Sequence, residues 1–211
     1  MSQPQVSQIQ TMLALQNSMN SKVNPDWRNQ HFEWYRAIWI ECAELLDHYG
    51  WKWWKHQETE TDQVILELID IWHFGLSNLI ERDVSADEIC RELTTGLDDK
   101  LTLEFPLLLE AFTEEVLRSR SFDTRRFGGL MQLIELDFEQ LFSSYVGKNV
   151  LNMFRQDKGY KDGTYHKSWD GHDDNEWLVI EMQKLDSGRE DFAEALYAAL
   201  KSTYPVGSSP C

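Results

Sequence analysis

The amino-acid sequence predicts an all-α fold arranged as a multi-helix bundle. Apolar residues recur at helical spacing through most of the chain. Strand signals are scarce, because few stretches alternate apolar and polar residues and no Asn-Gly or Asp-Gly turn joins two β-branched runs. A hydrophobic share of 42%, with nine Trp and ten Phe, is sufficient to form a core. A length of 211 residues suits one domain, so a single domain over residues 1–211 is expected.

Eight helices follow from this spacing, each bounded by segments that carry Gly, Pro, Asp or Ser. The start of the helix near residue 86 is also indicated by the Ser85-x-x-Glu88 capping box. The predicted helices span residues 5–21, 31–49, 62–81, 86–95, 104–119, 127–146, 148–157 and 188–201. Turns are predicted at Pro25, Gly50, the Gly128-Gly129 pair, Gly159 and Gly163.

The charge balance argues against a nucleic-acid polymer as a partner. Twenty Lys and Arg against 36 Asp and Glu give a net charge of −16. Sequence-independent binding to a phosphate backbone depends on Lys and Arg, which displace counterions. A protein that coats DNA or RNA is therefore excluded.

Three widely spaced cysteines indicate a reducing compartment. Cys42, Cys90 and Cys211 lack the CxxC or Cys/His spacing of zinc and redox sites. The N-terminal stretch MSQPQVSQIQ lacks the features of a secretory signal, and no apolar run approaches the roughly 20 residues that span a bilayer. We therefore expect a cytoplasmic protein with no membrane partner.

Two pairs of acids on neighbouring helices predict a metal site. Glu41 and Glu44 lie three residues apart, as do Glu67 and Asp70, so each pair shares one helix face. The second pair interrupts the largely apolar stretch VILELIDIWHFGL (64–76). Buried carboxylates take up protons or bind cations, and an all-oxygen site suits Mg²⁺ or Mn²⁺.

Other interpretations of this region stay open. The acids can instead form buried salt bridges with Arg36 or Lys52. His73 lies on the same polar seam as Glu67 and Asp70, either as an ordinary core histidine or as a hydrogen-bond partner of a substrate or a carboxylate. The segment WKWWK (51–55) combines flat apolar rings with cations, which suits a cap on the core or stacking on a nucleobase.

A basic segment over residues 145–169 contrasts with the acidic chain. Lys148, Asn152 and Arg155 share one helix face, and a turn at 159–163 brings further donors close behind. Cations, amides and a tyrosine together suit a polyphosphate, since a metal cluster with a Lys/Arg clamp is a general arrangement for phosphoryl chemistry. A solvated run of charge is the alternative.

Four blocks of the chain carry a resemblance to a known family. They are MLALQNSMN (12–20), WIECAELLDHYGWKWWK (39–55), ELIDIWHF (67–74) and GKNVLNMFRQDKGYKDGTYHKSWDGHDDNEW (147–177). With these blocks the sequence resembles the dimeric all-α dUTPases, a branch of the MazG-like all-α NTP pyrophosphohydrolases. The resemblance implies the bundle of that superfamily, and residues 82–146, which match no block, are a candidate lineage-specific helical insertion.

The resemblance also implies roles for individual residues. Four carboxylates would hold a magnesium cluster on the triphosphate, with Mn²⁺ as a substitute: Glu41, Glu44, Glu67 and Asp70. The uracil edge would be read by Gln16 and Asn175, and the ring would be sandwiched by Phe74 and either Trp53 or Trp54. Phosphates or sugar would be bound by Lys148, Asn152, Arg155, Tyr160 and Lys167, with Asn20 and Lys161 as weaker candidates.

The predicted reaction is hydrolysis of dUTP to dUMP and pyrophosphate by attack of a metal-activated water on the α-phosphate. Glu41 is the expected base and Glu44 the alternative. A homodimer is expected, because the helices around Trp39 and Trp72 are apolar on more than one side. The alternatives are a related enzyme acting on another nucleotide, such as dCTP, and a non-catalytic all-α interaction protein. dUDP is a candidate second substrate beside dUTP.

Overall fold

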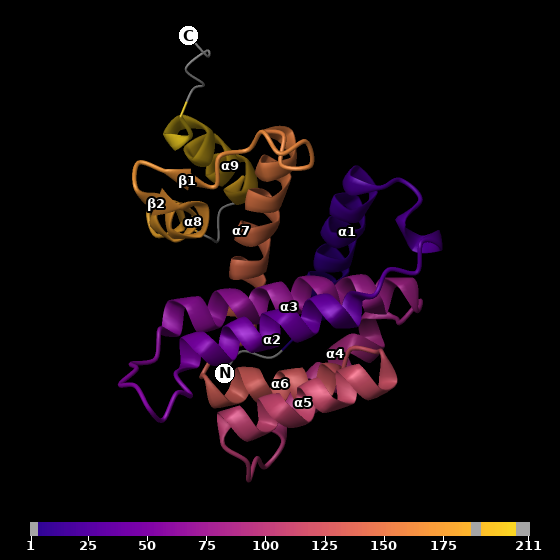
Figure 1. Ribbon diagram of the computed structural model, residues 1–211. Coiled ribbons are helices and arrows are strands. Elements are labelled where there is room, and N and C mark those ends of the chain that lie inside the picture. The colour runs from indigo at the N-terminus through magenta and orange to yellow at the C-terminus, as the bar shows by residue number, and fades with distance from the viewer. Residues whose placement is uncertain (1–3, 187–190, 206–211) are drawn as a thin grey trace. The chain divides into compact units, whose positions relative to one another are not determined.

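The computed structural model describes residues 4–186 and 191–205, and these are almost entirely helical (Figure 1). Within them, the strands are limited to a two-stranded sheet, so the predicted all-α fold is confirmed. The chain divides into two compact units, Met1–Tyr145 (unit 1) and Val146–Cys211 (unit 2). The single domain over 1–211 and the insertion at 82–146 stay predictions.

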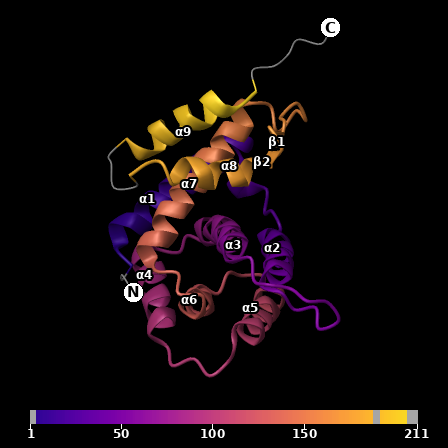
Figure 2. The same cartoon turned by 90° about the vertical axis from the view of Figure 1, so that its left-hand side faces the viewer.

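Unit 1 is a helical bundle. Its elements are α1 (Val6–Val23), the 3₁₀ turn η1 (Trp27–Asn29), α2 (Trp34–Tyr49), α3 (Thr61–Glu81), α4 (Ala86–Asp98), α5 (Phe105–Ser119) and α6 (Thr124–Leu133). α2 packs against α3 and α5, α1 against α3 and α4, and α6 against α4 and α5. Figure 2 views α2, α3, α5 and α6 nearly end-on, as a single group. The predicted helices from 5–21 to 104–119 correspond to α1–α5, although α2 begins at Trp34 because His31 has a φ of 52°.

The central helix of unit 1 is α3, which is buried over most of its length. Trp72 is fully buried and stacks on Phe127 of α6, with ring centroids 5.0 Å apart. An added Cβ at Gly75 would lie 2.6 Å from the Phe122 ring, so α3 also packs closely against that side chain. Polar residues on α3 are therefore placed in or beside the core, where each needs a partner.

The predicted turn at Gly128-Gly129 is wrong, because both residues lie inside α6. A Cβ built on Gly128 would lie 3.1 Å from the Cα of Gly96 on α4. A Cβ on Gly96 would lie 2.0 Å from the carbonyl oxygen of Arg125. These glycines serve close helix packing, since any side chain at the crossing would force α4 and α6 apart.

The helix predicted over 127–146 is also wrong: α6 ends at Leu133 and α7 (Phe138–Asp157) begins after a break. Glu135 adopts a left-handed φ of 57°. Asp137 then caps α7, because its Oδ1 accepts from the Gln140 amide at 2.9 Å while Gln140 Oε1 accepts from the Asp137 amide at 3.0 Å. The helix predicted over 148–157 is the second half of α7, which runs from unit 1 into unit 2.

Unit 2 contains the rest of α7, a hairpin of β1 (Ser168–Trp169) and β2 (His172–Asp173), α8 (Asp174–Met182) and α9 (Phe192–Thr203). The hairpin turn is Asp170-Gly171, with positive φ at both positions. An Asp-Gly pair is a typical hairpin turn, but this one was not predicted because the residues on either side of it are not β-branched runs. The predicted helix 188–201 matches α9, apart from residues 188–190, which lie outside the described part. The unit's core consists of Val150, Leu151, Phe154, Trp169, Leu178, Phe192, Leu196 and Leu200.

Helix α8 was not predicted from the sequence, although its start carries a clear signal. Asp173 accepts from the backbone at the start of α8, and Glu176 Oε2 accepts from the Asp173 amide at 2.7 Å, which completes a capping box. The D-x-x-E spacing of these two residues is the sequence signature of that box. The cap matters here because it fixes the backbone of Asn175, one of the predicted site residues.

The structure bears on two expectations from the sequence: the absence of a membrane partner and the reduced state of the cysteines. Among the described residues, no helix combines the length and apolar character needed to cross a membrane. Cys42 and Cys90 are free thiols, and burial raises the pKa of Cys42 to about 12. Cys211 lies outside the described residues. The cytoplasmic location stays a prediction.

Candidate active site

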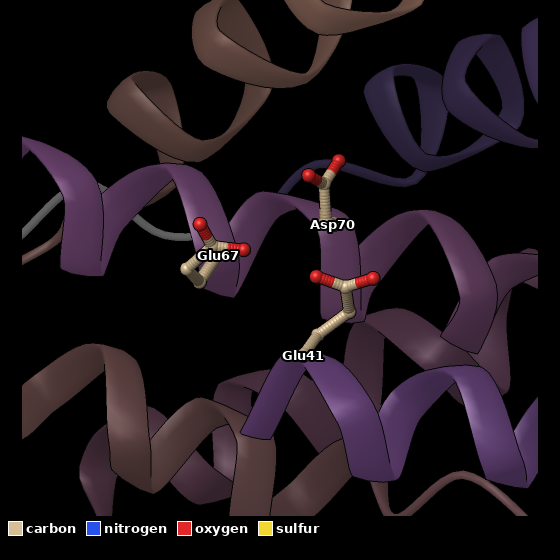
Figure 3. A group of neighbouring side chains, drawn as sticks. All are labelled: Glu41, Glu67 and Asp70. Carbon is tan, nitrogen blue, oxygen red and sulfur yellow. The ribbon is translucent and has the colours of Figure 1, made fainter. Parts of the chain in front are cut away.

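Three of the four predicted carboxylate ligands converge between α2 and α3. Glu41 projects from α2 toward Glu67 and Asp70, which lie one turn apart on α3 (Figure 3). One ligand atom from each residue lies within 4.8 Å of the others. Glu67 is buried and the other two are half-buried, so this cluster of Glu41, Glu67 and Asp70 (the carboxylate cluster) is sheltered from bulk water.

The electrostatics of the carboxylate cluster favour a bound cation. Burial is the main cause that raises the pKa of Glu41 to about 9, followed by the charge of Asp70, a hydrogen bond and the charge of Glu67, and the charge of Glu44. Such a shift means that the metal-free cluster cannot hold all its negative charge. A divalent cation relieves that repulsion, and an all-oxygen donor set is the kind that Mg²⁺ and Mn²⁺ prefer.

The fourth predicted ligand, Glu44, lies outside this close group. It is exposed on α2, one turn after Glu41, and its charge still acts on Glu41. The alternative interpretation was that Arg36 or Lys52 forms salt bridges with the acids of the cluster. In the structure Arg36 pairs instead with Glu33 at 3.2 Å, and Lys52 pairs with Asp47.

A histidine near the cluster was missed by the sequence analysis. His48 Nε2 lies 3.9 Å from Glu67 Oε1, and its Nδ1 lies 2.6 Å from Glu60 Oε2. His48 lies seven residues after Glu41 on α2 and therefore on the same helix face. This spacing would have allowed its prediction from the sequence.

The predicted base-reading residue Gln16 is the centre of a buried hydrogen-bond network. Its Nε2 donates to Asn20 Oδ1 and to Ser77 Oγ, both at 3.0 Å. Its Oε1 lies 2.8 Å from His73 Nδ1 and accepts from the Tyr145 hydroxyl at 3.0 Å. Both amide hydrogens are therefore donated, and the oxygen faces His73 and a Tyr145 hydroxyl whose single proton is shared with the Met12 carbonyl at 3.0 Å. Gln16 is thus bonded at both ends of its amide inside unit 1.

This network orients its other members. Because both amide hydrogens of Gln16 are directed elsewhere, His73 must carry its proton on Nδ1 to bond to Oε1. The His73 ring also stacks on Tyr145, with centroids 4.3 Å apart. Asn20, which is only partly buried, donates to Ser77 Oγ at 2.9 Å. Tyr145 and Ser77 were not identified from the sequence.

The three residues of the predicted aromatic sandwich, Phe74, Trp53 and Trp54, have different aromatic neighbours in unit 1. Phe74 stacks against Trp34 of α2, with centroids 6.4 Å apart and an interplanar angle of 29°. Trp34 is fixed in turn, because its indole N–H donates to Glu81 Oε2 at 2.7 Å. Trp53 and Trp54 lie in the loop between α2 and α3, exposed by 89% and 57% and edge-to-face with each other.

In unit 2 the predicted phosphate ligand Arg155 is held by an acid. Its guanidinium forms two 2.7 Å hydrogen bonds with Asp174, which is fully buried and also accepts from the Tyr165 hydroxyl at 2.8 Å. Arg155 also donates to Asn152 Oδ1 at 3.1 Å and lies 5.9 Å from the Tyr160 ring centroid. Burial opposes ionisation of Asp174, but the hydrogen bonds and charge of Arg155 outweigh it, so the pKa of Asp174 lies below its usual value.

The remaining predicted residues of unit 2 divide between buried and exposed positions. Lys148 is almost fully buried, and its Nζ donates to Asn175 Oδ1 at 2.9 Å. Lys167 is exposed and lies 3.6 Å from Asp173, and Lys161 is exposed within the 159–163 turn. Structure thus brings Lys148, Asn152, Arg155, Tyr160 and Asn175 together within unit 2.

A mostly helical fold with a sheltered carboxylate cluster defines a class of protein: an all-α protein with donors suited to a divalent cation. The comparison with protein families is more specific. A family model described as dUTPase matches residues 8–160, and the chain belongs to this all-α dUTPase family. No curated protein matches the chain.

Family membership establishes the activity in general terms. The protein is a hydrolase of dUTP, a dUTP diphosphatase, and the family uses divalent metal. The predicted resemblance is therefore confirmed. The matched range runs through residues 82–146, for which the sequence blocks indicated no relationship.

Proposed function

We propose that the protein hydrolyses dUTP to dUMP and pyrophosphate by attack of water on the α-phosphate, with Mg²⁺ as its cofactor and Mn²⁺ as a substitute. The observation that carries this proposal is the approach of Glu41, Glu67 and Asp70 to within 4.8 Å in a chain of the dUTPase family. Such a cation would neutralise triphosphate charge and make a water molecule easier to deprotonate. Glu44, one turn from Glu41, would complete the ligand set.

The proton acceptor is proposed to be Glu41, with Glu44 as the alternative. Burial, together with the charge of the neighbouring acids, keeps Glu41 protonated in the metal-free protein. Once that charge is neutralised, Glu41 becomes an ionised carboxylate at the edge of the cluster and can accept a proton. Glu44 has the same chemistry in a more exposed position.

Nucleotide contacts are proposed separately for each unit. In unit 1 the partly buried Asn20 and Phe74 are the proposed contacts, with Gln16 and His73 in the network behind Asn20, and with Trp53 and Trp54 as exposed rings for stacking. In unit 2 the proposed contacts are Asn152, Arg155, Tyr160, Lys161, Lys167 and Asn175. Cations and a phenol of this kind suit phosphate and sugar.

A homodimer is proposed from an exposed apolar surface on α2. Trp39 and Ile40 are 48% and 50% exposed, whereas Trp72 on α3 is fully buried. Adjacent large apolar side chains that remain exposed on a monomer mark interfaces, and a second copy related by a two-fold axis is the commonest partner. Sedimentation tests this: Trp39→Lys should shift a dimer toward monomer, and a wild-type monomer at micromolar concentration would contradict the proposal.

The deciding experiment is a nucleotide panel with released pyrophosphate as the readout, run with Mg²⁺ and with excess EDTA. dUTP should be the preferred substrate, with dUDP and dCTP as comparisons, and EDTA should abolish turnover. Asp70→Asn and Glu67→Gln should reduce turnover strongly, whereas Glu58→Gln, a change at a 90% exposed side chain, serves as the matched control. Full activity in EDTA would contradict the metal site, and a preference for dCTP would contradict the proposed substrate.

A further inference from the structure

Lys148 has an unusual environment for a residue predicted to bind phosphate. Its side chain is 1% exposed, in the part of α7 that belongs to unit 2. Its Nζ donates to Asn175 Oδ1 at 2.9 Å. A lysine is rarely buried to this extent, because its ammonium loses hydration. A methionine of similar length would fill the same space without that cost. We therefore take the hydrogen bonds of the Lys148 amine, including the one to Asn175, as the reason for a lysine at this position.

Asn175 is held from two sides. Its backbone N–H donates to Asp173 Oδ1 at 3.1 Å within the capping box of α8. Its side-chain oxygen accepts from Lys148 and also from Arg155 Nη2, at 3.4 Å. Arg155 is itself fixed by the paired hydrogen bonds to the buried Asp174. Two fixed cationic donors therefore converge on the same carboxamide oxygen.

This geometry determines which way the carboxamide faces. Ammonium and guanidinium groups donate hydrogen bonds and cannot accept them. If the Asn175 amide rotated by half a turn, its NH₂ group would face two donors. The oxygen must therefore face Lys148 and Arg155, and the group directed away from them is the NH₂ donor.

We propose that Lys148 is a positioning residue that sets base preference by locking the Asn175 carboxamide with its NH₂ group toward the base. This rests on the proposed function as a dUTP hydrolase. A donor matches the O4 carbonyl of uracil and opposes the N4 amino group of cytosine, which is also a donor. From the sequence alone, either the oxygen or the NH₂ group of Asn175 could contact the base. The proposal assigns this contact to the NH₂ group.

The first test replaces the lock and measures kcat/KM for dUTP and dCTP. Lys148→Met removes the closer of the two donors and leaves only the 3.4 Å contact from Arg155. The amide can then turn its oxygen outward, so the dUTP/dCTP ratio should fall by about tenfold or more, the scale of one mispaired buried polar group. Lys148→Arg keeps a group that only donates and should retain most of the ratio. Lys184→Met, at an exposed lysine of the same unit, is the matched control and should leave the ratio unchanged.

A second variant, Asn175→Asp, tests the same geometry with Lys148 intact. One carboxylate oxygen would stay on Lys148 and the other would face the base as an acceptor, so preference should move toward dCTP, whose amino group donates. This variant decides the matter if Lys148→Met does not fold, as judged by thermal denaturation. An unchanged ratio in this variant would overturn the proposal.

The outcomes separate this inference from the function on which it rests. A wild-type protein that prefers dUTP, together with a folded Lys148→Met protein that keeps the same dUTP/dCTP ratio, overturns the role of Lys148 and leaves the proposed function standing. A loss of kcat/KM equal for both nucleotides also overturns it, because that is the result expected of a phosphate ligand. A wild-type protein without dUTP turnover overturns the proposed function itself.

Discussion

Binding of Mg²⁺ to the metal-free protein should release a proton from Glu41. The perturbation is a change of pH across the range in which Glu41 is protonated in the folded chain and ionised in the unfolded one. Its ordinary pKa is 4.5, and burial with the charges of Asp70, Glu67 and Glu44 raises it to about 9. At pH 7 the metal-free protein therefore carries this carboxyl almost entirely protonated, with roughly one molecule in a hundred ionised.

The magnitude follows from one displaced proton. If the cation binds only ionised Glu41, close to one proton is released per binding event between about pH 5.5 and 8, and apparent affinity rises about tenfold per pH unit. The dependence should flatten as the pH approaches 9. The free energy of unfolding of the metal-free protein should fall with pH, whereas the metal affinity rises. Because the pKa of Glu41 is raised on folding, its contribution to stability is fully present below pH 4.5 and is lost as the pH rises through about 9.

Isothermal titration calorimetry is the assay, with MgCl₂ titrated into metal-free protein in two buffers of different ionisation enthalpy. The difference in apparent enthalpy gives the number of protons released, expected to be near one at pH 7 and near zero for Glu41→Gln. Glu58→Gln, at an exposed side chain, should behave as wild type. Proton release near zero in the wild-type protein, or an affinity that is flat from pH 6 to 8, would refute the reasoning.

Three further predictions concern the framework of the site. Gly96→Ala should destabilise the protein by about 1–3 kcal/mol in thermal or urea unfolding, because the added Cβ would lie 2.0 Å from the Arg125 carbonyl oxygen; an equal or higher Tm would contradict it. Asp174→Asn should cost about 3–5 kcal/mol in urea, since it leaves the buried Arg155 charge without its counterion. Because the pKa of Asp174 is lowered, the wild-type advantage should be complete above about pH 4 and shrink in acid, and a pH-independent deficit would argue against the ion pair. Gln16→Met should lower stability by about 1–3 kcal/mol while changing the dUTP/dCTP ratio little, and a collapse of that ratio would show that Gln16 reads the base directly.

The helices were predictable where apolar or polar residues recur at helical spacing. α3 is the clearest case, because the ionisable residues of its largely apolar stretch VILELIDIWHFGL (64–76) are Glu67, Asp70 and His73, which recur every three residues. The break between α6 and α7 was not predictable from periodicity, since the residues around Glu135 keep a helical apolar pattern across it. That break depends on one left-handed residue and on the reciprocal cap of Asp137 and Gln140, which are local backbone effects.

The candidate site was predictable to the extent that its chemistry conflicts with its surroundings. Glu67 and Asp70 were identified because acids are costly on an apolar helix, and the structure places both beside Glu41. Tyr145 was missed because its bond to Gln16 joins residues 129 positions apart, and nothing in a local pattern indicates that pairing. Asp174 was missed because no helix was predicted over 174–182, so no local pattern placed this acid against Arg155, 19 residues earlier in the chain.

Gln16 and Asn175 show why an amide in a motif does not by itself identify the residue that contacts a base. Each has its oxygen facing two donors: Gln16 faces His73 and Tyr145, and Asn175 faces Lys148 and Arg155. The difference lies in the NH₂ group, because both hydrogens of Gln16 are donated within unit 1. The Asn175 oxygen is fixed, whereas its NH₂ group donates to no side chain or carbonyl in the part of the chain that the structure describes. Such an amide offers one defined polarity to a ligand, which is the requirement for telling a carbonyl from an amino group. By this reasoning we expect Asn175 to discriminate between bases, whereas we expect Gln16 to orient Asn20 and His73 within unit 1.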